Sequence, residues 1–455
     1  MSYNYNNDQH EWKVNSSPNI LFPSKKELID EAEKWAANNQ FFLFKASSDK
    51  KRVVLKCVKG GVYSNTRNSD EFIRKSSTIK TNCPFLVKGR EQSNGEWKLI
   101  ITNNTHNHLP FQNLSAHPQG RKLYEDQIQS VLKLNSALVK PNQIINLIGL
   151  QKCTNRDIYN VIAADKRKKL DGKTPIQYLL EHLSSSDIFS RPMYDDTGHL
   201  KHLFFAFPES IKLTRRFGDV ILADSTYKTN KFKLPLLHFV GITNIGTSFS
   251  CGYCFLNAEN DDAYNWALES FKICFNLINV PVFVTDQENA LINAIYNNYP
   301  TASHLLCIWH INKNIIKNCK KNFEDTEKFE EFMKDWNILL SCTEEHQFET
   351  SLLEFKISYK GFPKAIEYIM KNLYPVRQKI VRCWTNSVRH LGTLSTSRVE
   401  GQHHSAIKKY LVNSSGDLLQ CFNAFRLASE IQMNQYEISV SVEKEKNFTH
   451  LGLTC

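Results

Sequence analysis

Three acidic residues stand where an enzyme could place catalytic carboxylates. Asp224 ends the apolar run GDVILAD, Asp286 ends VPVFVTD, and Glu400 opens a helix-like stretch in TSRVEGQHH. Strand ends that lie side by side in one sheet bring their terminal side chains into a common crevice. Three carboxylates there would repel one another unless divalent cations lay between them, and oxygen ligands favour Mg²⁺ or Mn²⁺ over zinc. Two such ions about 3.5 to 4 Å apart can activate an attacking oxygen and stabilise a leaving oxygen at phosphorus.

Each of these carboxylates also has a structural interpretation. Asp224 could be a turn residue before Ser225, and Asp286 could cap the helix that follows it. The segment from Ser397 to Glu400 has the spacing of a capping box. Taken singly, each position favours the structural interpretation, because helix caps are far commoner than catalytic acids.

A second group of residues has the types and spacing of zinc ligands. Cys57 and Cys83 are separated by 25 residues, and His106 and His108 follow after 22 more in the sequence HNH. Residues i and i+2 of an extended strand point to the same side, so both imidazoles can reach one ion. Two thiolates on neighbouring strands would complete a tetrahedral zinc site, and a structural metal would stabilise a small sheet with a thin core. The alternative is two core cysteines with two surface histidines.

The sequence CGYC, which contains Cys251 and Cys254, also has a metal-like spacing. It lies within an apolar strand pattern and has no second ligand pair nearby. We therefore interpret these two cysteines as core residues.

The zinc ligands require a small sheet to hold them. FPSKKELIDEAEKWAANNQ predicts an amphipathic helix that Ser24 caps, with Leu28, Ala32 and Trp35 on one face. Four strand-like runs follow, separated by polar or glycine-containing turns: FFLFKAS, KRVVLKCV, CPFLVKGRE and EWKLIIT. We expect a flexible tail over residues 1–20 and a small antiparallel zinc-binding sheet over residues 21–112.

The carboxylates require a larger sheet. Residues 113–200 predict a helical linker with four short helices, at DQIQSVLKLNSALV, PNQIINLIGLQ, NRDIYNVIAADKRKKL and TPIQYLLEHL. Three hairpin-like strands then precede an alternation of helix and strand, which predicts a mixed sheet covered by helices over residues 201–440. Residues from about 313 to 390 are helical and charged, and a tail is expected over 441–455. The chain as a whole is expected to be a multidomain protein that combines α+β and α/β architecture.

Composition restricts the class of protein. With 41% apolar residues and 28 Phe, the 455-residue chain fits an ordered globular protein of two or three domains. It shows no apolar run of about 18 residues and no signal-peptide pattern, so we expect a soluble intracellular protein with reduced cysteines and no membrane partner. Residues 1–180 hold 28 Lys and Arg against 16 Asp and Glu, which accounts for the net charge of +11. A concentrated positive surface attracts a phosphate backbone, although a solvated basic face is the commoner outcome for charge runs.

The acidic blocks together resemble a Mutator-like (MULE) transposase of the far-red-impaired-response type, over roughly residues 20 to 440. GDVILADSTYKTNKFKLPLLHFVGIT is similar to the family's first-Asp block, VPVFVTDQENALINAI to its second-Asp block, SHLLCIWHINKNI to its Cys-x-x-His block and SRVEGQHHSAIKKYL to its Glu block. The resemblance implies an RNase H-like fold with a helical insertion before the Glu helix. It also makes Asp224, Asp286 and Glu400 the DDE residues that hold catalytic Mg²⁺ or Mn²⁺.

Two further positions in these blocks bear on the resemblance. Cys307 and His310 match the Cys-x-x-His pair, for which a structural contact, a DNA contact and a metal contact all stay open. Gly401 and His403 stand where the family commonly has Ser and Asn, so the surroundings of Glu400 depart from its pattern.

The zinc-type residues resemble the WRKY and glial-cells-missing type of zinc finger, in its far-red-impaired-response version. The family pattern C…CPF…W…HNH is matched by Cys57, the CPF that begins at Cys83, Trp97 and the HNH that begins at His106. In that family a strand of the zinc-bound sheet enters the DNA major groove. Residues 45–98 carry 13 Lys and Arg against 5 Asp and Glu, which agrees with a DNA-facing sheet. A further zinc segment of the SWIM type is not expected, because Cys455 is the only cysteine after residue 421.

Two functions from different classes follow. The first is a DNA transposase whose N-terminal sheet holds transposon ends, while the DDE residues cleave DNA and transfer the 3′ hydroxyls into target DNA. The second is a domesticated DNA-binding transcription regulator that uses the RNase H-like domain as a scaffold. The presence of all three acidic residues favours the enzyme, whereas an NTPase and a serine or cysteine hydrolase lack a supporting motif.

Both functions place the protein on double-stranded DNA in the nucleus, and both are compatible with a homo-oligomer. The basic cluster from Lys166 to Lys169 could be a nuclear-import signal or a phosphate contact. A favourable interaction with the dipole of the helix that it ends is an equally good interpretation.

Overall fold

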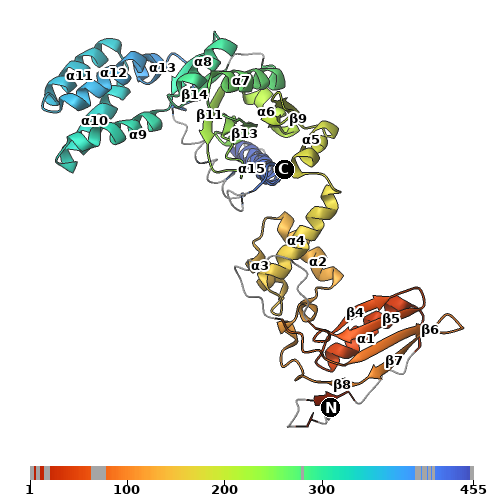
Figure 1. Ribbon diagram of the computed structural model, residues 1–455. Helices are drawn as coiled ribbons and strands as arrows, with labels where there is room; N and C mark the ends of the chain where they lie inside the picture. The colour runs from red at the N-terminus through yellow and green to blue at the C-terminus, as the bar shows by residue number, and fades with distance from the viewer. Residues whose placement is uncertain are drawn as a thin grey trace. The chain divides into compact units, whose positions relative to one another are not determined.

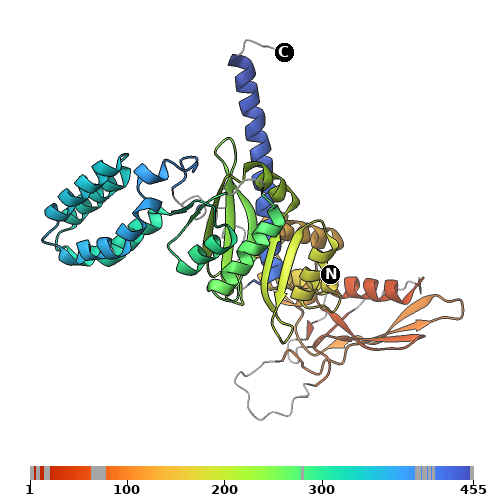
Figure 2. The same cartoon turned by 90° about the horizontal axis from the view of Figure 1, so that it is seen from above.

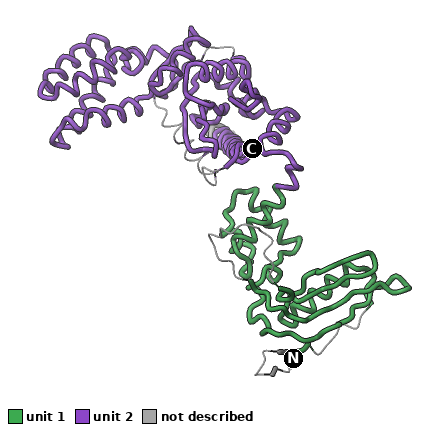
Figure 3. Tube along the Cα trace, viewed as in Figure 1, with its two compact units in different colours: residues 1–166 green, residues 167–455 purple. Residues whose placement is uncertain are grey.

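The computed structural model describes residues 5–6, 11–14, 21–62, 78–277, 281–394, 401, 407, 411 and 416–450, with side chains omitted at 5–12 and 446–450. The chain divides into two compact units, residues 1–166 and 167–455 (Figures 1 and 3). Most of the tail expected over residues 1–20 lies outside the described residues. The tail expected over 441–455 is helical as far as His450.

The first unit contains a five-stranded antiparallel sheet in the order β3-β7-β6-β5-β4 (Figure 1). The four strand-like runs predicted from the sequence are its four long strands. The strands are β3 (Leu21–Phe22), β4 (Leu43–Ser48), β5 (Arg52–Cys57), β6 (Leu86–Glu91) and β7 (Trp97–Asn103). A smaller sheet joins β1 (Tyr5–Asn6), β2 (Glu11–Lys13) and β8 (Thr105–His106).

Helix α1 (Lys25–Asn38) covers one face of the five-stranded sheet. Ser24 caps it as predicted, accepting a hydrogen bond from the amide of Glu27 at 3.2 Å. Leu28, Ala32 and Ala36 are buried against alternate residues of the strands, such as Val53 and Leu99. The residues between them in each strand therefore point to the opposite face of this sheet.

Three helices follow the sheet and complete the first unit. They are α2 (Glu125–Ser136), α3 (Pro141–Ile148) and α4 (Asn155–Leu170), preceded by the 3₁₀ turns η1 (Leu114–Ala116) and η2 (Pro118–Arg121). They pack around a small apolar cluster of Val131, Ile144, Leu150 and Ile158. The helices predicted over this stretch are confirmed.

The second unit is built on a seven-stranded mixed sheet in the order β15-β14-β11-β12-β13-β10-β9. β11, β12, β13, β10 and β9 pair antiparallel, whereas β14 and β15 continue parallel to β11. The strands are β9 (Phe189–Tyr194), β10 (Leu200–Ala206), β11 (Val220–Thr226), β12 (Leu236–Ile242), β13 (Ser248–Phe255), β14 (Val282–Thr285) and β15 (His304–Leu306). The mixed sheet is confirmed, but the sequence analysis did not assign β9 and β10.

Helices cover both faces of this sheet (Figure 2). On one face, α7 (Asp261–Phe275) and α8 (Asn289–Asn298) bury an aromatic core that includes Phe239, Phe271 and Phe283. On the other, the start of the long helix α15 (Leu418–His450) packs Phe425 on Tyr253, with ring centroids 4.6 Å apart. α5 (Pro175–Ser185) contacts α15, whereas α6 (Pro208–Phe217) packs with α7 in the aromatic core of the first face.

The segment after β15 is helical, as predicted. It contains α9 (Ile308–Cys319), η3 (Lys320–Asn322), α10 (Thr326–Ser341), α11 (Glu345–Ser358), α12 (Pro363–Asn372), η4 (Tyr374–Lys379) and α13 (Arg382–Thr385), which share an apolar core of their own. Cys251 and Cys254 are fully buried in the sheet, which confirms them as core residues. None of the helices described is long and apolar enough to cross a membrane.

Candidate functional site

The predicted zinc ligands lie together at one end of the five-stranded sheet. One donor atom from each of Cys57, Cys83, His106 and His108 lies within 4.8 Å of all the others, and all four residues are buried. Cys57 Sγ is 3.2 Å from His108 Nε2, and Cys83 Sγ is 3.3 Å from His106 Nδ1. β5 ends at Cys57 and β6 begins after Cys83, so the two thiols come from neighbouring strands as expected.

Neighbouring groups orient these four side chains. His108 Nδ1 lies 2.8 Å from the carbonyl of Leu109 and donates to it, which turns the Nε2 lone pair towards the cluster. The ring of His106 stacks on Phe85, with centroids 4.2 Å apart. Gly60 closes a tight turn after Cys57, because its amide donates to the Cys57 carbonyl at 2.7 Å and a Cβ there would lie 2.9 Å from that oxygen.

The cluster has the electrostatics of a cation site. A hydrogen bond from Cys57, supported by His106 and His108, lowers the pKa of the Cys83 thiol far below its ordinary value. The same hydrogen bond, together with burial, raises the pKa of Cys57. A buried pair of thiolates needs a positive charge between them.

The donor set fits zinc. Two thiols and two imidazoles are the Cys₂His₂ set that takes tetrahedral Zn²⁺. The backbone amide of Lys59 donates to Cys57 Sγ and that of Phe85 donates to Cys83 Sγ, which stabilises both as thiolates. The cluster can therefore bind zinc through the four predicted residues.

The face of this sheet opposite α1 is basic. Arg52 pairs directly with Arg90, and Arg90 with Lys98, so three exposed cations cross three adjacent strands in one row. Like charges directly opposite each other on a sheet destabilise it, and a polyanion bound across the row would relieve this repulsion. The face, which we call the basic face, carries no acidic residue on these strands and consists of Arg52, Val54, Lys56, Leu86, Lys88, Arg90, Lys98 and Ile100.

The second unit brings two of the predicted carboxylates together. The parallel ladder of β11 and β14 pairs Val220 with Val282 and continues to Ala223 with Thr285. Asp224 and Asp286 are the residues that directly follow this last pair, and the charges of both act on His310. Side chains two residues apart on a strand lie on the same face of the sheet. Val220 and Leu222 of β11 and Val282 and Val284 of β14 belong to one apolar cluster on one face. Asp224 and Asp286 are the next residues in this alternation, so both carboxylates project from that face.

The surroundings of the two carboxylates are largely buried. Asp224 is only 6% exposed and lies opposite His238 of β12. Burial raises the pKa of Asp286, and the negative charges of Glu288 and Glu259 act in the same direction. A third predicted ligand, Glu400, lies outside the described residues. The described chain runs to Leu394, whose side chain packs on the face that carries Asp224 and whose carbonyl accepts from the Ile308 amide at 3.0 Å.

A hydrogen-bonded chain fixes the backbone at Asp286. Lys379 Nζ donates to His304 Nδ1 at 3.1 Å, and His304 Nε2 donates to Thr285 Oγ1 at 2.9 Å. Thr285 Oγ1 in turn donates to the carbonyl of Asp286 at 2.7 Å. Burial and the Lys379 charge lower the pKa of His304 to about 3, so the imidazole is neutral and can accept from the lysine.

Cys307 and His310 lie beside the carboxylates. β15 ends at Leu306, and Cys307 is the N-cap of α9. Its Sγ accepts from the His310 amide at 3.5 Å, and its own amide donates to the Thr285 carbonyl at 2.8 Å. Hydrogen bonding to Cys307 and the charges of Asp224 and Asp286 outweigh burial and raise the pKa of His310.

The structural interpretations of the two aspartates are wrong. Asp224 lies inside β11, which continues to Thr226, and is not a turn residue. Glu288, not Asp286, is the N-cap of α8. The sequence analysis also missed Glu259, which accepts a hydrogen bond from Tyr227 near Asp286. Its only signal was its position after a strand, in a loop that leads into the helix α7.

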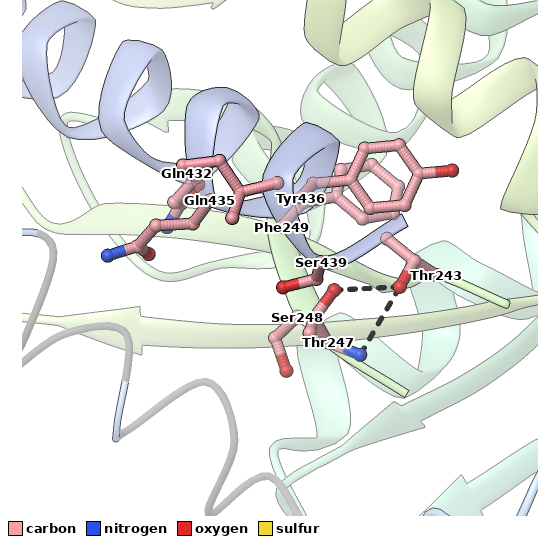
Figure 4. A pocket seen from close by; sticks show the side chains of 9 residues that line it. Thr243, Thr247, Ser248, Phe249, Gln432, Gln435, Tyr436 and Ser439 are labelled. Carbon is pink, nitrogen blue, oxygen red and sulfur yellow. Dashed lines mark hydrogen bonds between the residues drawn. The ribbon is translucent and has the colours of Figure 1, made fainter. Parts of the chain in front are cut away.

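A cavity of about 360 Å³ lies at the opposite end of β12 and β13 from Asp224 (Figure 4). Thr243 and Thr247 are joined there by a 2.7 Å hydrogen bond between their hydroxyls. The lining contains no charged side chain: Thr243, Thr247, Ser248, Phe249, Gln432, Gln435, Tyr436, Ile438 and Ser439. Among the described residues, its lining therefore offers no carboxylate, imidazole or amine.

Comparison with known protein families matches both halves of this description. Residues 37–112 match the FAR1 DNA-binding domain, and residues 220–314 match the MULE transposase domain. The first match contains the Cys/His cluster and the basic face. The second contains Asp224, Asp286, Cys307 and His310.

Several curated proteins are similar over most of the chain. Protein FAR1-RELATED SEQUENCE 5 of Arabidopsis thaliana is 25% identical over 402 residues, which cover 83% of this chain and 49% of that protein. Protein FAR-RED IMPAIRED RESPONSE 1 of the same plant is 23% identical, covering 78% of this chain and 44% of that protein. The PKS-NRPS hybrid synthetase cheA of Chaetomium globosum is 26% identical over 81% of this chain but only 9% of its own length. The chain thus spans half or less of the length of each of these relatives.

Proposed function

We propose that this chain, a transposase-derived DNA-binding protein of the FAR1-type Mutator-like kind, is a DNA transposase that cleaves DNA and transfers strands at its mixed sheet. The observation that carries the proposal is that Asp224 and Asp286 directly follow the last residue pair of the parallel ladder between β11 and β14, on one face. Both lie inside the segment that matches the MULE transposase domain. Glu400 would supply the third carboxylate.

The topology of the sheet supports an RNase H-like core. β11, β12 and β13 form an antiparallel meander, and β14 and β15 add parallel strands on the other side of β11. This arrangement puts the ends of the first and fourth core strands next to each other. The helices α9 to α13 would then be the insertion that precedes the Glu400 segment.

The acidic set fits Mg²⁺ or Mn²⁺. Asp224, Asp286 and Glu400 would hold the ions with carboxylate oxygens, which are the ligands that these hard cations prefer. Bound there, a pair of ions would activate an attacking oxygen and stabilise a leaving oxygen at phosphorus. Burial raises the pKa of Asp286 and so disfavours its charged form. A cation beside the carboxylate would favour the charged form and offset this effect of burial.

The chain's own residues would orient this centre. The chain from Lys379 through His304 and Thr285 fixes the backbone that carries Asp286. Cys307 caps α9, which places His310 near both carboxylates. We assign Cys307 a structural role and His310 a positioning role.

The first unit would hold the DNA ends. Zinc at Cys57, Cys83, His106 and His108 would fix the edge of the small sheet, and the basic face would contact phosphates. Both the transposon ends and the target are double-stranded DNA, so the site of action would be the nucleus. The basic residues Lys166 to Lys169 are candidates for the import signal.

The test is loss of catalysis without loss of binding. Asp224→Asn removes one anionic ligand from a buried pair, so we expect it to leave binding of the DNA that flanks the gene within twofold and to abolish cleavage and strand transfer. The matched control is Asp262→Asn, which changes an exposed carboxylate in the first turn of α7. Labelled duplexes from the flanking DNA, incubated with Mg²⁺ and resolved by gel electrophoresis, give both readouts. Equal activity of the two variants would refute the assignment.

A DNA-binding regulator without catalysis is the second candidate. The similarity to the two Arabidopsis thaliana proteins and the match to the FAR1 DNA-binding domain favour it. It predicts that wild-type chain and Asp224→Asn both bind DNA and that neither cleaves it.

A further inference from the structure

The loop that joins β11 to β12 follows Thr226, two residues after Asp224, and carries an unusual set of exposed side chains. Residues 227–235, here called the β11–β12 loop, read YKTNKFKLP. Three of them are exposed lysines, and Tyr227 and Phe232 are 54% and 52% exposed. No acidic residue occurs between Ser225 and Ala258 in the sequence.

A buried asparagine holds the loop in one shape. Asn230 is 2% exposed, and its Oδ1 accepts from the amides of Phe232 and Leu234, each at 3.1 Å. Its Nδ2 donates to the Leu234 carbonyl at 2.8 Å. The Asn230 side chain thus folds the tip of the loop back on itself, and the neighbouring side chains of Lys231 and Phe232 stay exposed to solvent.

The middle of the loop is tied to the chain at the start of α15. Cys421 Sγ donates to the carbonyl of Thr229 at 3.2 Å, and the amide of Lys231 donates to the carbonyl of Gly416 at 2.9 Å. Thr229 itself is fully buried. The loop is therefore part of the folded domain and not an unsupported surface segment.

The backbone of the loop is strained at two lysines. Lys228 has a φ of 59° and Lys233 a φ of 60°, which is the left-handed region that side chains other than glycine adopt uncommonly. Asn230 lies between them. Strained residues that the surrounding structure enforces occur preferentially where ligands are held.

The exposed groups suit a nucleic-acid strand. The Nζ of Lys231 lies 4.9 Å from the centre of the Phe232 ring, so a cation and an aromatic face are presented together. Lysines bind phosphates, and an aromatic ring stacks on a base. Paired bases in a duplex hide their faces from such a ring, so the exposed Phe232 fits an unpaired base.

The loop also adjoins the carboxylates. The Tyr227 hydroxyl donates to Glu259, whose charge acts on Asp286. A strand that reached Asp224 from this side would therefore cross the loop first.

We propose that the β11–β12 loop binds the DNA strand next to the scissile phosphate, with its three lysines on phosphates and Phe232 stacked on an unpaired base. This inference rests on the proposed function, in that it takes the substrate to be DNA. It adds the element that would select a frayed or single-stranded end.

The experiment compares two DNA probes on the full chain. One probe is a duplex from the DNA that flanks the gene, with a four-nucleotide 3′ overhang, and the other is the same duplex with blunt ends. Affinities are measured by fluorescence anisotropy without divalent cations, so that no cleavage occurs. We expect Phe232→Leu to weaken binding of the overhang probe about tenfold and binding of the blunt probe less than twofold.

Two further variants make the result specific. Phe232→Trp keeps a stacking face and should retain binding of the overhang probe. Lys231→Gln combined with Lys233→Gln should reduce the slope of log affinity against log salt by about 2, since each lysine contacts one phosphate. The matched controls are Tyr296→Leu, at an exposed tyrosine of α8, and Lys328→Gln with Lys334→Gln on α10.

The outcomes separate this proposal from the proposed function. If Phe232→Leu binds both probes as the wild type does, or if the control variants lose as much affinity, the loop proposal is overturned. If the wild type never cleaves DNA in Mg²⁺ but Phe232→Leu still loses the overhang probe selectively, the loop proposal stands and the enzymatic function falls. Thermal unfolding of each variant, unchanged from wild type, excludes a folding defect.

Discussion

The two sheets of this protein hold their functional residues in opposite ways. In the five-stranded sheet, Cys57 and Cys83 are members of the apolar core as well as candidate ligands. In the seven-stranded sheet, Asp224 lies near the end of β11 and Asp286 directly follows β14, and the aromatic core, which includes Phe239 and Phe271, does not contain them. We therefore expect the small sheet to depend on its site for folding and the large sheet to fold without its site.

This difference follows from size. A small sheet covered by one helix buries less apolar surface than a sheet covered on both faces, and a bound metal would add stability. The large sheet is covered on both faces and can afford two buried carboxylates beside each other. The lesson is that the same change, loss of a site residue, should unfold one region and spare the other.

The largest effect should come from removing the metal. Cys83→Ser, or a strong chelator, takes away a ligand set that contributes on the order of 10 kcal/mol in small zinc domains, so we expect the five-stranded sheet to unfold. Hydrogen exchange measured by mass spectrometry should show β4 to β7 exchanging fully while β11 to β13 stay protected.

The matched control for that experiment is Cys153→Ser, which changes a half-buried cysteine of the first unit outside the cluster. Slow exchange in β5 and β6 of metal-free Cys83→Ser would contradict the comparison, because the apolar core would then be sufficient.

An intermediate effect should appear on acidification of the large sheet. His304 has a folded pKa of about 3, below the 6.5 of an unfolded histidine, so its contribution is full above pH 6.5 and is lost as the pH falls towards 3. We expect the second unit to lose up to about 1.4 kcal/mol per pH unit in this window through this residue. The midpoint of urea unfolding, followed through exchange of β11 and β14, should fall less steeply with pH in His304→Gln.

The control for the pH experiment is His199→Gln, at a histidine whose side chain is 83% exposed in the turn between β9 and β10. It should leave the pH dependence of the wild type unchanged. If His304→Gln follows the same curve as His199→Gln, the network from Lys379 to Asp286 does not stabilise the sheet.

The smallest effect should be on DNA affinity at the basic face. Arg90→Gln removes the central cation of the row, so we expect affinity for duplex DNA to fall a few-fold and the slope against log salt to drop by about 1. Lys34→Gln, on the exposed side of α1, is the matched control. A slope that is the same for both variants would show that the phosphates lie elsewhere.

Much of this could be predicted from the sequence. The strands β4 to β7 alternate apolar and polar residues, and β11 and β14 are short apolar runs that end in a carboxylate, so periodicity alone located them. The spacing from Cys57 to His108 was enough to predict the ligand cluster, because its residues come from consecutive strands and one HNH turn. Sequence patterns were sufficient wherever the residues that contact one another are close in the sequence.

The rest depended on tertiary pairing. β9 contains Pro192 and little alternation, so only its pairing with β10 identifies it as an edge strand. The end of β15 at Leu306 depends on Cys307 capping α9, and a cysteine is not an ordinary capping residue. The contribution of Glu259 could not be seen, because it reaches the site through Tyr227, a residue far from it in the sequence.

The pairing register of β11 and β14 determines whether Asp224 and Asp286 project from the same face. Four residue pairs join the two strands before these aspartates, and side chains alternate between the two faces along each strand. Sliding β14 by a single residue would turn Asp286 to the opposite side of the sheet, under α7 and α8. One added residue within either strand should therefore abolish activity at the site while leaving the fold recognisable.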